Sequence, residues 1–279
     1  MSEAVNWQLI LENWCIEFDV PRTYLPDILA NPKVTPMIRG YAFEYNVMTA
    51  LRGLLSTETW KVEKLVMNAQ DGLHDNDVLV HHIASGIDIR IECKLAKKGS
   101  FRTRKDNPEC QVKCMRSRTL GEGKLPGRAQ ELGVSVDHLR SHSDNYTPAE
   151  FDYVVSGLSN AFYSTDEESL EYIWSPSKDA ETFLRNYLPN QQLSTKEIAA
   201  GYFLLAQSEN LTPDGSGVKC SRRSCSMKDT CKFIPNYPVV TFSKNDFKPN
   251  APWFEISSME QDFLNFVTKK ITLPSKNNS

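Results

Sequence analysis

Three charged residues stand where their side chains could converge on one catalytic centre. Asp77 opens the apolar run "DVLVHHI", and Glu92 and Lys94 lie near the end of "IDIRIECKLA", which follows after the three residues "ASG". Two such runs joined by a short connection predict a β-hairpin, in which side chains alternate between two faces. Glu92 and Lys94 therefore share one face, about 7 Å apart, and strand pairing can bring Asp77 beside Glu92.

Two convergent carboxylates repel each other, and a divalent cation relieves that repulsion. Mg²⁺ is bound through one or two carboxylates, several waters and a substrate phosphate, so Asp77 and Glu92 are candidate Mg²⁺ ligands. Lys94 beside them could hold an attacking water or stabilise charge on a phosphate. The alternative interpretation is an amphipathic hairpin whose solvated face happens to contain Glu and Lys.

A further acid lies on an expected helix that precedes these strands. The stretch "RGYAFEYNVMTALRGLL" predicts a helix over 39–55 with an apolar stripe. Glu44 shares the face of that stripe, because Val47 and Met48 follow it by three and four positions. An acid on an apolar stripe is unusual, and it makes Glu44 a fourth candidate for the site.

The rest of the chain alternates between helical and strand-like patterns. The periodicity predicts helices over 3–18, 39–55, 177–188, 194–210 and 258–270. It predicts strands over 60–67, 77–83, 87–96, 151–158 and 237–242. Helices and strands arranged around one sheet indicate an α/β fold, or an α+β fold if the antiparallel hairpin dominates.

The pattern of acids and lysine resembles the PD-(D/E)xK nuclease superfamily. In that family an acid begins one strand and (D/E)xK lies on the next, which are the places of Asp77 and of Glu92-Cys93-Lys94. Asn76 stands where the family often has proline. Two other acid-x-Lys triplets, "EGK" and "DFK", lie in a glycine-bearing loop and a turn-like segment and lack this context.

The resemblance covers roughly residues 39–160 and implies a fold, a metal and a reaction. Glu44 matches a further acid on the preceding helix, and the neighbouring Asp75 is an alternative to Asp77 as the first acid. The implied fold is a restriction-endonuclease-like core, a central mixed sheet flanked by helices. The implied chemistry is Mg²⁺-dependent hydrolysis of a phosphodiester, with Asp77 and Glu92 as ligands.

We expect three regions along the chain. Residues 1–60 would form a helical region that packs on the core, and residues 61–193 would form the nuclease core. A basic excursion over 99–147 would interrupt this core. Residues 194–279 would form a helical and cysteine-rich subdomain.

The charge of the chain is unevenly distributed. The formal net charge is −3, yet residues 90–128 hold twelve Lys and Arg against four acids. A local basic stretch in an acidic protein favours contact with a polyanion, here double-stranded DNA, although a solvated flexible loop would have the same composition. Side chains there could contact phosphates or guanine edges. The candidates are Arg102, Arg104, Lys105, Arg116, Arg118, Lys124 and Arg128.

Three of the seven cysteines form a second candidate metal site. They lie in "KCSRRSCSMKDTCKF" as Cys220-x4-Cys225-x5-Cys231, and thiolates at this density favour zinc or an iron–sulfur cluster. The x5 spacing is similar to iron–sulfur exonucleases of the same superfamily, in which a cysteine before the core completes the set. Cys15 could fill that role, and the alternative is three free thiols.

Other fourth ligands are also conceivable for this cysteine site. Cys110 or Cys114 could be brought over by folding. A finger-like pairing of these two with His138 and His142 is disfavoured by the long segment between the pairs. We therefore interpret His138 and His142 as solvated polar residues or DNA contacts.

Composition and length allow a soluble globular enzyme. The chain has 279 residues, of which 40% are hydrophobic and 24% charged. No apolar run is long enough for a membrane span. We expect a cytoplasmic protein with reduced cysteines. The resemblance implies a type II restriction endonuclease, expected to be a homodimer. The alternatives are an iron–sulfur exonuclease or repair nuclease, and a non-catalytic nucleic-acid-binding protein with a structural zinc.

Overall fold

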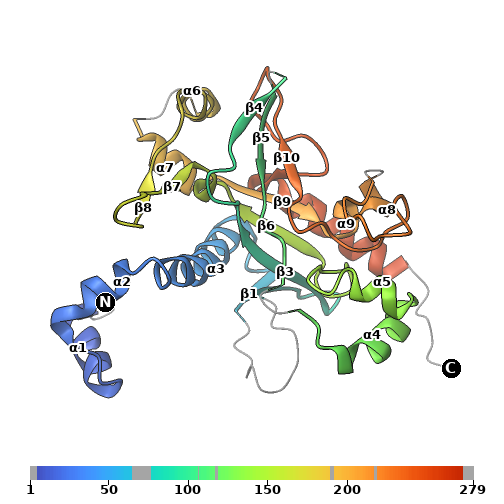
Figure 1. The fold of residues 1–279 in the computed structure, drawn as a ribbon, viewed down its shortest axis with the longest axis horizontal. Helices are drawn as coiled ribbons and strands as arrows, with labels where there is room; N and C mark the ends of the chain where they lie inside the picture. Colours follow the sequence, from blue (N-terminus) through green and yellow to red (C-terminus); the bar gives the residue numbers. More distant parts are fainter. Residues whose placement is uncertain are drawn as a thin grey trace.

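A six-stranded mixed sheet forms the centre of the protein (Figure 1). The computed structural model describes residues 5–64, 77–105, 107–116, 119–188, 192–216 and 219–272. The strands follow the order β1 (Trp60–Glu63), β2 (Val78–His82), β3 (Ile87–Leu95), β6 (Tyr153–Gly157), β9 (Phe203–Gln207) and β11 (Phe254–Glu255). β3 and β6 are parallel, and the other neighbouring strands are antiparallel.

Helices cover both faces of this sheet, which confirms the expected mixed α/β fold. α3 (Thr35–Leu54) and α9 (Met259–Thr272) pack on one face, where Tyr153 and Val155 of β6 belong to their core cluster. Val154 lies between these two in sequence and points to the opposite face. That face is covered by α6 (Lys178–Tyr187) and α7 (Thr195–Ala200). Alternation along one buried strand thus feeds two separate hydrophobic cores.

The basic excursion is built of regular elements. β4 (Arg102–Arg104) and β5 (Asn107–Gln111) form a three-stranded sheet with β10 (Val239–Thr241). Two short helices follow, α4 (Leu125–Leu132) and α5 (Val136–Arg140). Further short elements are β7 (Tyr163–Thr165), β8 (Tyr172–Trp174) and α8 (Pro213–Ser216). Single 3-10 turns lie at Arg22–Tyr24, Glu122–Lys124, Leu158–Phe162, Glu209–Leu211 and Ile256–Ser258.

The helix predicted over 194–210 is wrong in its second half. α7 ends at Ala200, and the apolar residues that follow form β9, which pairs with both β6 and β11. A short apolar run buried on both sides has no periodicity that distinguishes helix from strand. A capping box between Ser194 and Glu197 closes the start of α7.

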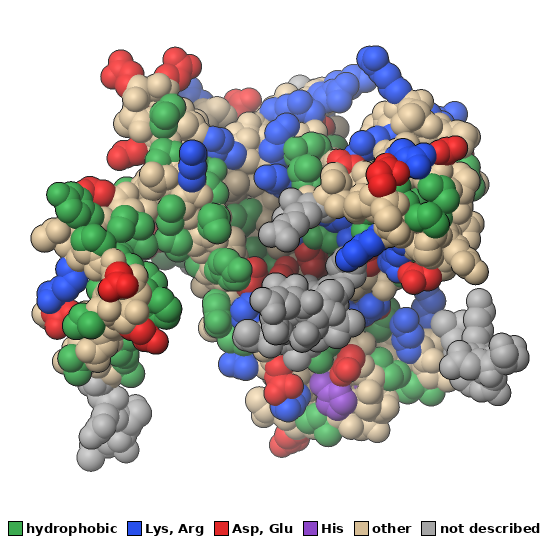
Figure 2. Space-filling view, turned by 60° about the horizontal axis from the view of Figure 1, so that its bottom comes forward, with side chains coloured by type: hydrophobic (Ala, Val, Ile, Leu, Met, Phe, Trp, Pro, Cys, Tyr) green, Lys and Arg blue, Asp and Glu red, His purple; other side chains and the backbone are tan. Residues whose placement is uncertain are grey.

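The N-terminal arm, residues 5–30, contains α1 (Trp7–Glu17) and α2 (Leu25–Ala30) and extends away from the sheet (Figure 1). Of the helical region expected over 1–60, α3 packs on the sheet. The arm leaves large apolar side chains exposed, including Trp7 at 74% and Ile16 at 74%, and Figure 2 shows hydrophobic side chains spread over it. Within the described ranges, no helix has both the length and the apolar character needed to cross a bilayer.

Candidate functional site

A cavity of about 420 Å³ lies beside the start of β2. β2 begins at Val78, opposite Ile91, whereas β3 continues to Leu95. The last residues of β3 therefore extend past β2, while they stay paired with β6 on their other edge. Asp77, Lys94 and Glu44 line this cavity.

The hairpin brings the two predicted acids and the lysine together. The Nζ atom of Lys94 lies 2.5 Å from Oε1 of Glu92, as an ion pair in which Glu92 is buried. Asp77 turns its carboxylate toward the same strand, where its Oδ2 accepts a hydrogen bond of 2.7 Å from the backbone N–H of Cys93. Glu92 acts electrostatically on Asp77, so the two carboxylates are neighbours. The shared polar face expected from strand alternation is thus present.

Burial and charge both act on the titration of these groups. Burial, followed by repulsion from Glu92, raises the pKa of Asp77 to about 7. Burial alone would lower the pKa of Lys94, but attraction by Glu92 and Asp77 raises it well above its ordinary value. Lys94 is therefore protonated at neutral pH, and a second negative charge in the cavity is disfavoured. A bound cation would relieve that cost, because it favours the ionised carboxylate.

Glu44, which reaches the cavity from α3, already has a partner. It forms an ion pair with Lys64, and the two side chains are only 16% and 14% exposed. Burial opposes the charge on Lys64, but the hydrogen bond and attraction from Glu44 raise the pKa of Lys64. Glu44 would have to release Lys64 before it could bind a metal directly.

Sequence reasoning missed two residues of the cavity. The first is Tyr146, whose Oη accepts a hydrogen bond of 3.4 Å from Nζ of Lys94. The second is Lys113, which also lines the cavity. Tyr146 follows Lys94 by 52 positions. No local pattern marks such a distant neighbour, because the contact depends on how the excursion folds back.

The predicted DNA-binding residues do not form one surface. β4 carries the exposed Arg102 and Arg104, with Lys105 after them, and Arg102 pairs with Glu109 at 2.5 Å. Lys124 and Arg128 lie before and on α4, at the opposite side of the molecule (Figure 1).

Two of the predicted DNA-binding residues remain. Arg116 is buried in an ion pair with Glu150, so it forms part of the cavity wall and not a free basic surface. Arg118 lies outside the described residues, as do Asp75 and Asn76 of the hairpin prediction.

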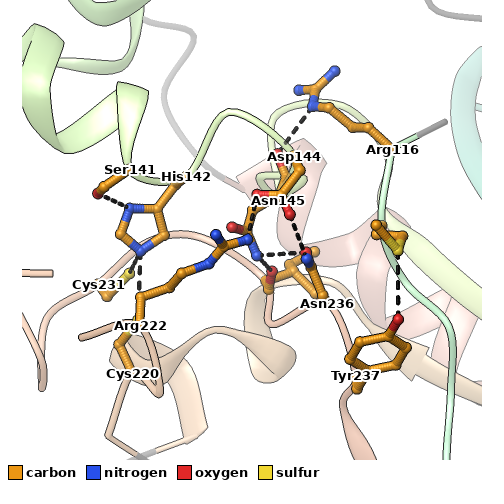
Figure 3. Close-up of polar contacts among 12 residues, drawn as sticks. Arg116, Ser141, His142, Asp144, Asn145, Cys220, Arg222, Cys231, Asn236 and Tyr237 are labelled. Carbon is orange, nitrogen blue, oxygen red and sulfur yellow. Dashed lines mark hydrogen bonds and ion pairs between the residues drawn. The ribbon is translucent and has the colours of Figure 1, made fainter. Parts of the chain in front are cut away.

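The second predicted metal site has a different composition from the one expected. His138, His142, Cys225 and Cys231 are all buried, and one potential ligand atom from each lies within 4.8 Å of the others. Cys220 lies beside them, with its Sγ 3.4 Å from Nε2 of His142 (Figure 3). The interpretation of His138 and His142 as solvated residues is therefore wrong. The donors of this His/Cys cluster are typical of a metal such as zinc.

The other proposed fourth ligands lie elsewhere. Cys110 and Cys114 belong to the hydrophobic core on the face of the sheet that α6 and α7 cover. Cys15 lies on α1, at the far end of the molecule from α5 (Figure 1). Burial lowers the pKa of His138 and of His142, so both imidazoles are neutral at pH 7 and can offer a lone pair.

Comparison with known proteins does not assign this chain to a group: no family model, no curated protein and no solved structure matches it. The chemistry of the two sites therefore has to be argued from their own geometry.

Proposed function

We propose that this protein is a Mg²⁺-dependent endonuclease that hydrolyses phosphodiester bonds of double-stranded DNA at specific sites. A restriction-endonuclease-like core would carry the reaction, as in type II restriction enzymes. The observation that supports the proposal most is the pair of neighbouring carboxylates, half-buried Asp77 and buried Glu92, beside an ammonium group near the end of β3. A structural hairpin gains nothing from this arrangement, because desolvating like charges costs free energy.

The residues of the cavity have separate roles in this proposal. Asp77 and Glu92 would hold the Mg²⁺, which would polarise a phosphate oxygen and lower the pKa of a water. Lys94 would hold the attacking water or the phosphate oxygen, and Tyr146 would keep its ammonium group in place. Lys113 would attract the phosphate backbone toward the cavity.

Supporting features for the proposed partners lie outside the cavity. The exposed side chains of Arg102, Arg104 and Lys105 on and after β4 would contact DNA phosphates, which sets affinity without reading sequence. The apolar N-terminal arm would pack against a second copy of the chain, since exposed apolar surfaces of this size mark interaction sites. A homodimer would place one cavity on each DNA strand.

A cleavage assay tests the function directly. Wild-type protein should convert supercoiled plasmid to discrete linear fragments with Mg²⁺ and should leave it intact without Mg²⁺. Lys94→Ala should abolish cleavage while it retains DNA binding in a gel-shift assay. Lys248→Ala is the matched control, because Lys248 ends another acid-x-Lys triplet, Asp246-Phe247-Lys248, far from the cavity in sequence, and should cut normally.

The result distinguishes the remaining functions. Unchanged cleavage by Lys94→Ala would remove this residue from the mechanism. Progressive degradation from DNA ends would favour an exonuclease, and binding without cleavage under any divalent cation would favour a non-catalytic DNA-binding protein. For the His/Cys cluster we propose zinc and not an iron–sulfur cluster, because nitrogen donors accompany the sulfurs.

A further inference from the structure

Hydrogen bonds organise the His/Cys cluster. Nδ1 of His142 lies 2.9 Å from the backbone oxygen of His138 and 2.9 Å from Oγ of Ser141. This hydrogen bonding directs the other ring nitrogen, Nε2, toward two sulfurs, that of Cys220 at 3.4 Å and that of Cys231 at 3.6 Å (Figure 3). Metal-bound histidines are held in the same way, with the second nitrogen on a backbone carbonyl.

The spacing of the donor atoms fits a tetrahedral ion. Zn–S and Zn–N bonds are about 2.3 and 2.0 Å long, so neighbouring N and S ligands of one zinc lie about 3.5 Å apart. The separations of His142 from Cys231, 3.6 Å, and from Cys220, 3.4 Å, both meet that value, so it is the mutual closeness of all four donors that selects Cys231. Nδ1 of His138 is also buried without a hydrogen-bond partner, although buried polar atoms of this kind are nearly always satisfied.

We propose that His138, His142, Cys225 and Cys231 hold one structural Zn²⁺ that clamps residues 138–147 to residues 220–236. Cys220 lies next to the site but outside the group of four mutually close atoms. The ligands come from α5 and its C-terminal end on one side and from a segment with little regular structure on the other. Such a segment has few backbone hydrogen bonds of its own, and a metal supplies the missing constraint.

A polar network continues from the clamp to the wall of the acid-lined cavity. Asp144 pairs with Arg222 and accepts a hydrogen bond of 2.6 Å from Nδ2 of Asn236. Nδ2 of Asn145 donates to the backbone oxygen of Ile234 at 2.7 Å (Figure 3).

The network ends at two residues of the cavity. The backbone N–H of Ile234 donates to the carbonyl of Tyr146 at 2.9 Å. Nε of Arg116 donates to the carbonyl of Asn145, also at 2.9 Å. The zinc would therefore position Tyr146 and Arg116, and through Tyr146 the ammonium group of Lys94. The effect on cleavage rests on the proposed function, whereas the metal site does not.

Metal analysis tests the site without reference to activity. The purified full-length protein should contain about one equivalent of zinc by mass spectrometry. Replacement with Co²⁺ should give the visible absorption of a tetrahedral, thiolate-ligated ion. Protein that holds less than about a fifth of an equivalent, or holds iron instead, would overturn the proposal.

Single variants test the ligand set. His142→Ala, Cys225→Ser and Cys231→Ser should each lose most of the zinc. Cys110→Ala is the matched control, because this cysteine is also buried but lies in the core under α6 and α7. This variant should keep one equivalent of zinc. Cys220→Ser should keep zinc and His138→Ala should lose it; the reverse outcome would contradict the ligand set. Should a variant fail to fold, release of zinc from wild-type protein by a thiol-blocking mercurial still tests whether thiolates hold the ion, and zinc that stays bound would contradict the site.

Hydrogen exchange tests the clamp. Removing zinc should increase amide exchange in both 138–147 and 220–236, while the β2–β3 hairpin should stay protected. Increased exchange confined to 220–236, with 142–147 unchanged, would show that the metal does not position Tyr146. If cleavage is absent from the wild-type protein but zinc content and exchange behave as stated, the clamp stands and the proposed nuclease function fails.

Discussion

Replacing Asp77 by Asn should stabilise the protein when Mg²⁺ is absent, although Asp77 is proposed to be essential for cleavage. Burial and repulsion from Glu92 raise the pKa of Asp77 to about 7, so the folded state disfavours its ionised form. Asn cannot ionise, and its side-chain oxygen can still accept the 2.7 Å hydrogen bond from the N–H of Cys93. A proposed metal ligand would thus be a source of instability in the metal-free protein.

The size and sign of this effect follow from proton linkage. The unfolded chain has an ordinary Asp pKa of about 3.9, so between about pH 4 and 7 the folded state retains a proton that the unfolded state has lost. The stability of the wild type therefore falls as the pH rises through this range. At 1.36 kcal/mol for each pH unit, the cost reaches at most about 4 kcal/mol at pH 8 and about 1.5 kcal/mol at pH 5. Solvent screening reduces both values, and we expect a gain of about 2 kcal/mol for Asp77→Asn at pH 8.

Urea unfolding at the two pH values measures the effect. Wild type and Asp77→Asn are compared at pH 5 and pH 8 in buffer free of Mg²⁺, with the His/Cys cluster in the same metal state in all samples. Asp166→Asn is a control of opposite sign, because hydrogen bonds from Ser169 lower the pKa of Asp166, and this variant should lose stability at pH 8. Added Mg²⁺ should stabilise the wild type at pH 8 and leave Asp77→Asn unchanged.

One outcome would refute this reasoning. If the difference in the free energy of unfolding between Asp77→Asn and wild type were the same at pH 5 and pH 8, the carboxylate of Asp77 would not be destabilised by its surroundings. The case for a cation between Asp77 and Glu92 would then lose its main support.

Two further predictions concern the sheet and the arm. Gly157→Ala should lower the free energy of unfolding, measured by urea denaturation, by about 1–3 kcal/mol. The reason is that a Cβ at this position would lie 2.5 Å from Cε2 of Phe43. The exposed Gly123 has room for a Cβ, so Gly123→Ala is the control. Replacing the exposed Trp7 and Trp14 of the arm by Ser should shift the protein from dimer to monomer in light scattering, and a wild type that is already monomeric would exclude the proposed dimer.

The parts of the site that lie in one local pattern follow from the sequence alone. The alternation of "IDIRIECK" places Glu92 and Lys94 on one face, and the acid just before the preceding strand lies beside them. These relations depend on the period of a strand and on a short connection, both of which are properties of neighbouring residues. The capping box at Ser194 likewise depends only on residues three positions apart.

Long-range relations required the tertiary structure. The apolar run 203–207 is a strand and not a helix because β6 and β11 pair with its two edges, and neither strand is adjacent to it in the chain. No local pattern places His138 and His142 beside Cys225 and Cys231, because these cysteines follow more than eighty positions later.

The sequence by itself determined a hairpin that concentrates two acids and a lysine, a mixed α/β architecture and a cysteine-rich segment able to bind a metal. The tertiary structure decided that Glu92 is buried in an ion pair with Lys94, that Glu44 is already paired with Lys64, and that two histidines join the cysteines. The physical reason is the range of the interactions. Backbone geometry sets the direction of neighbouring side chains, whereas burial and charge depend on whichever distant segments fold against them.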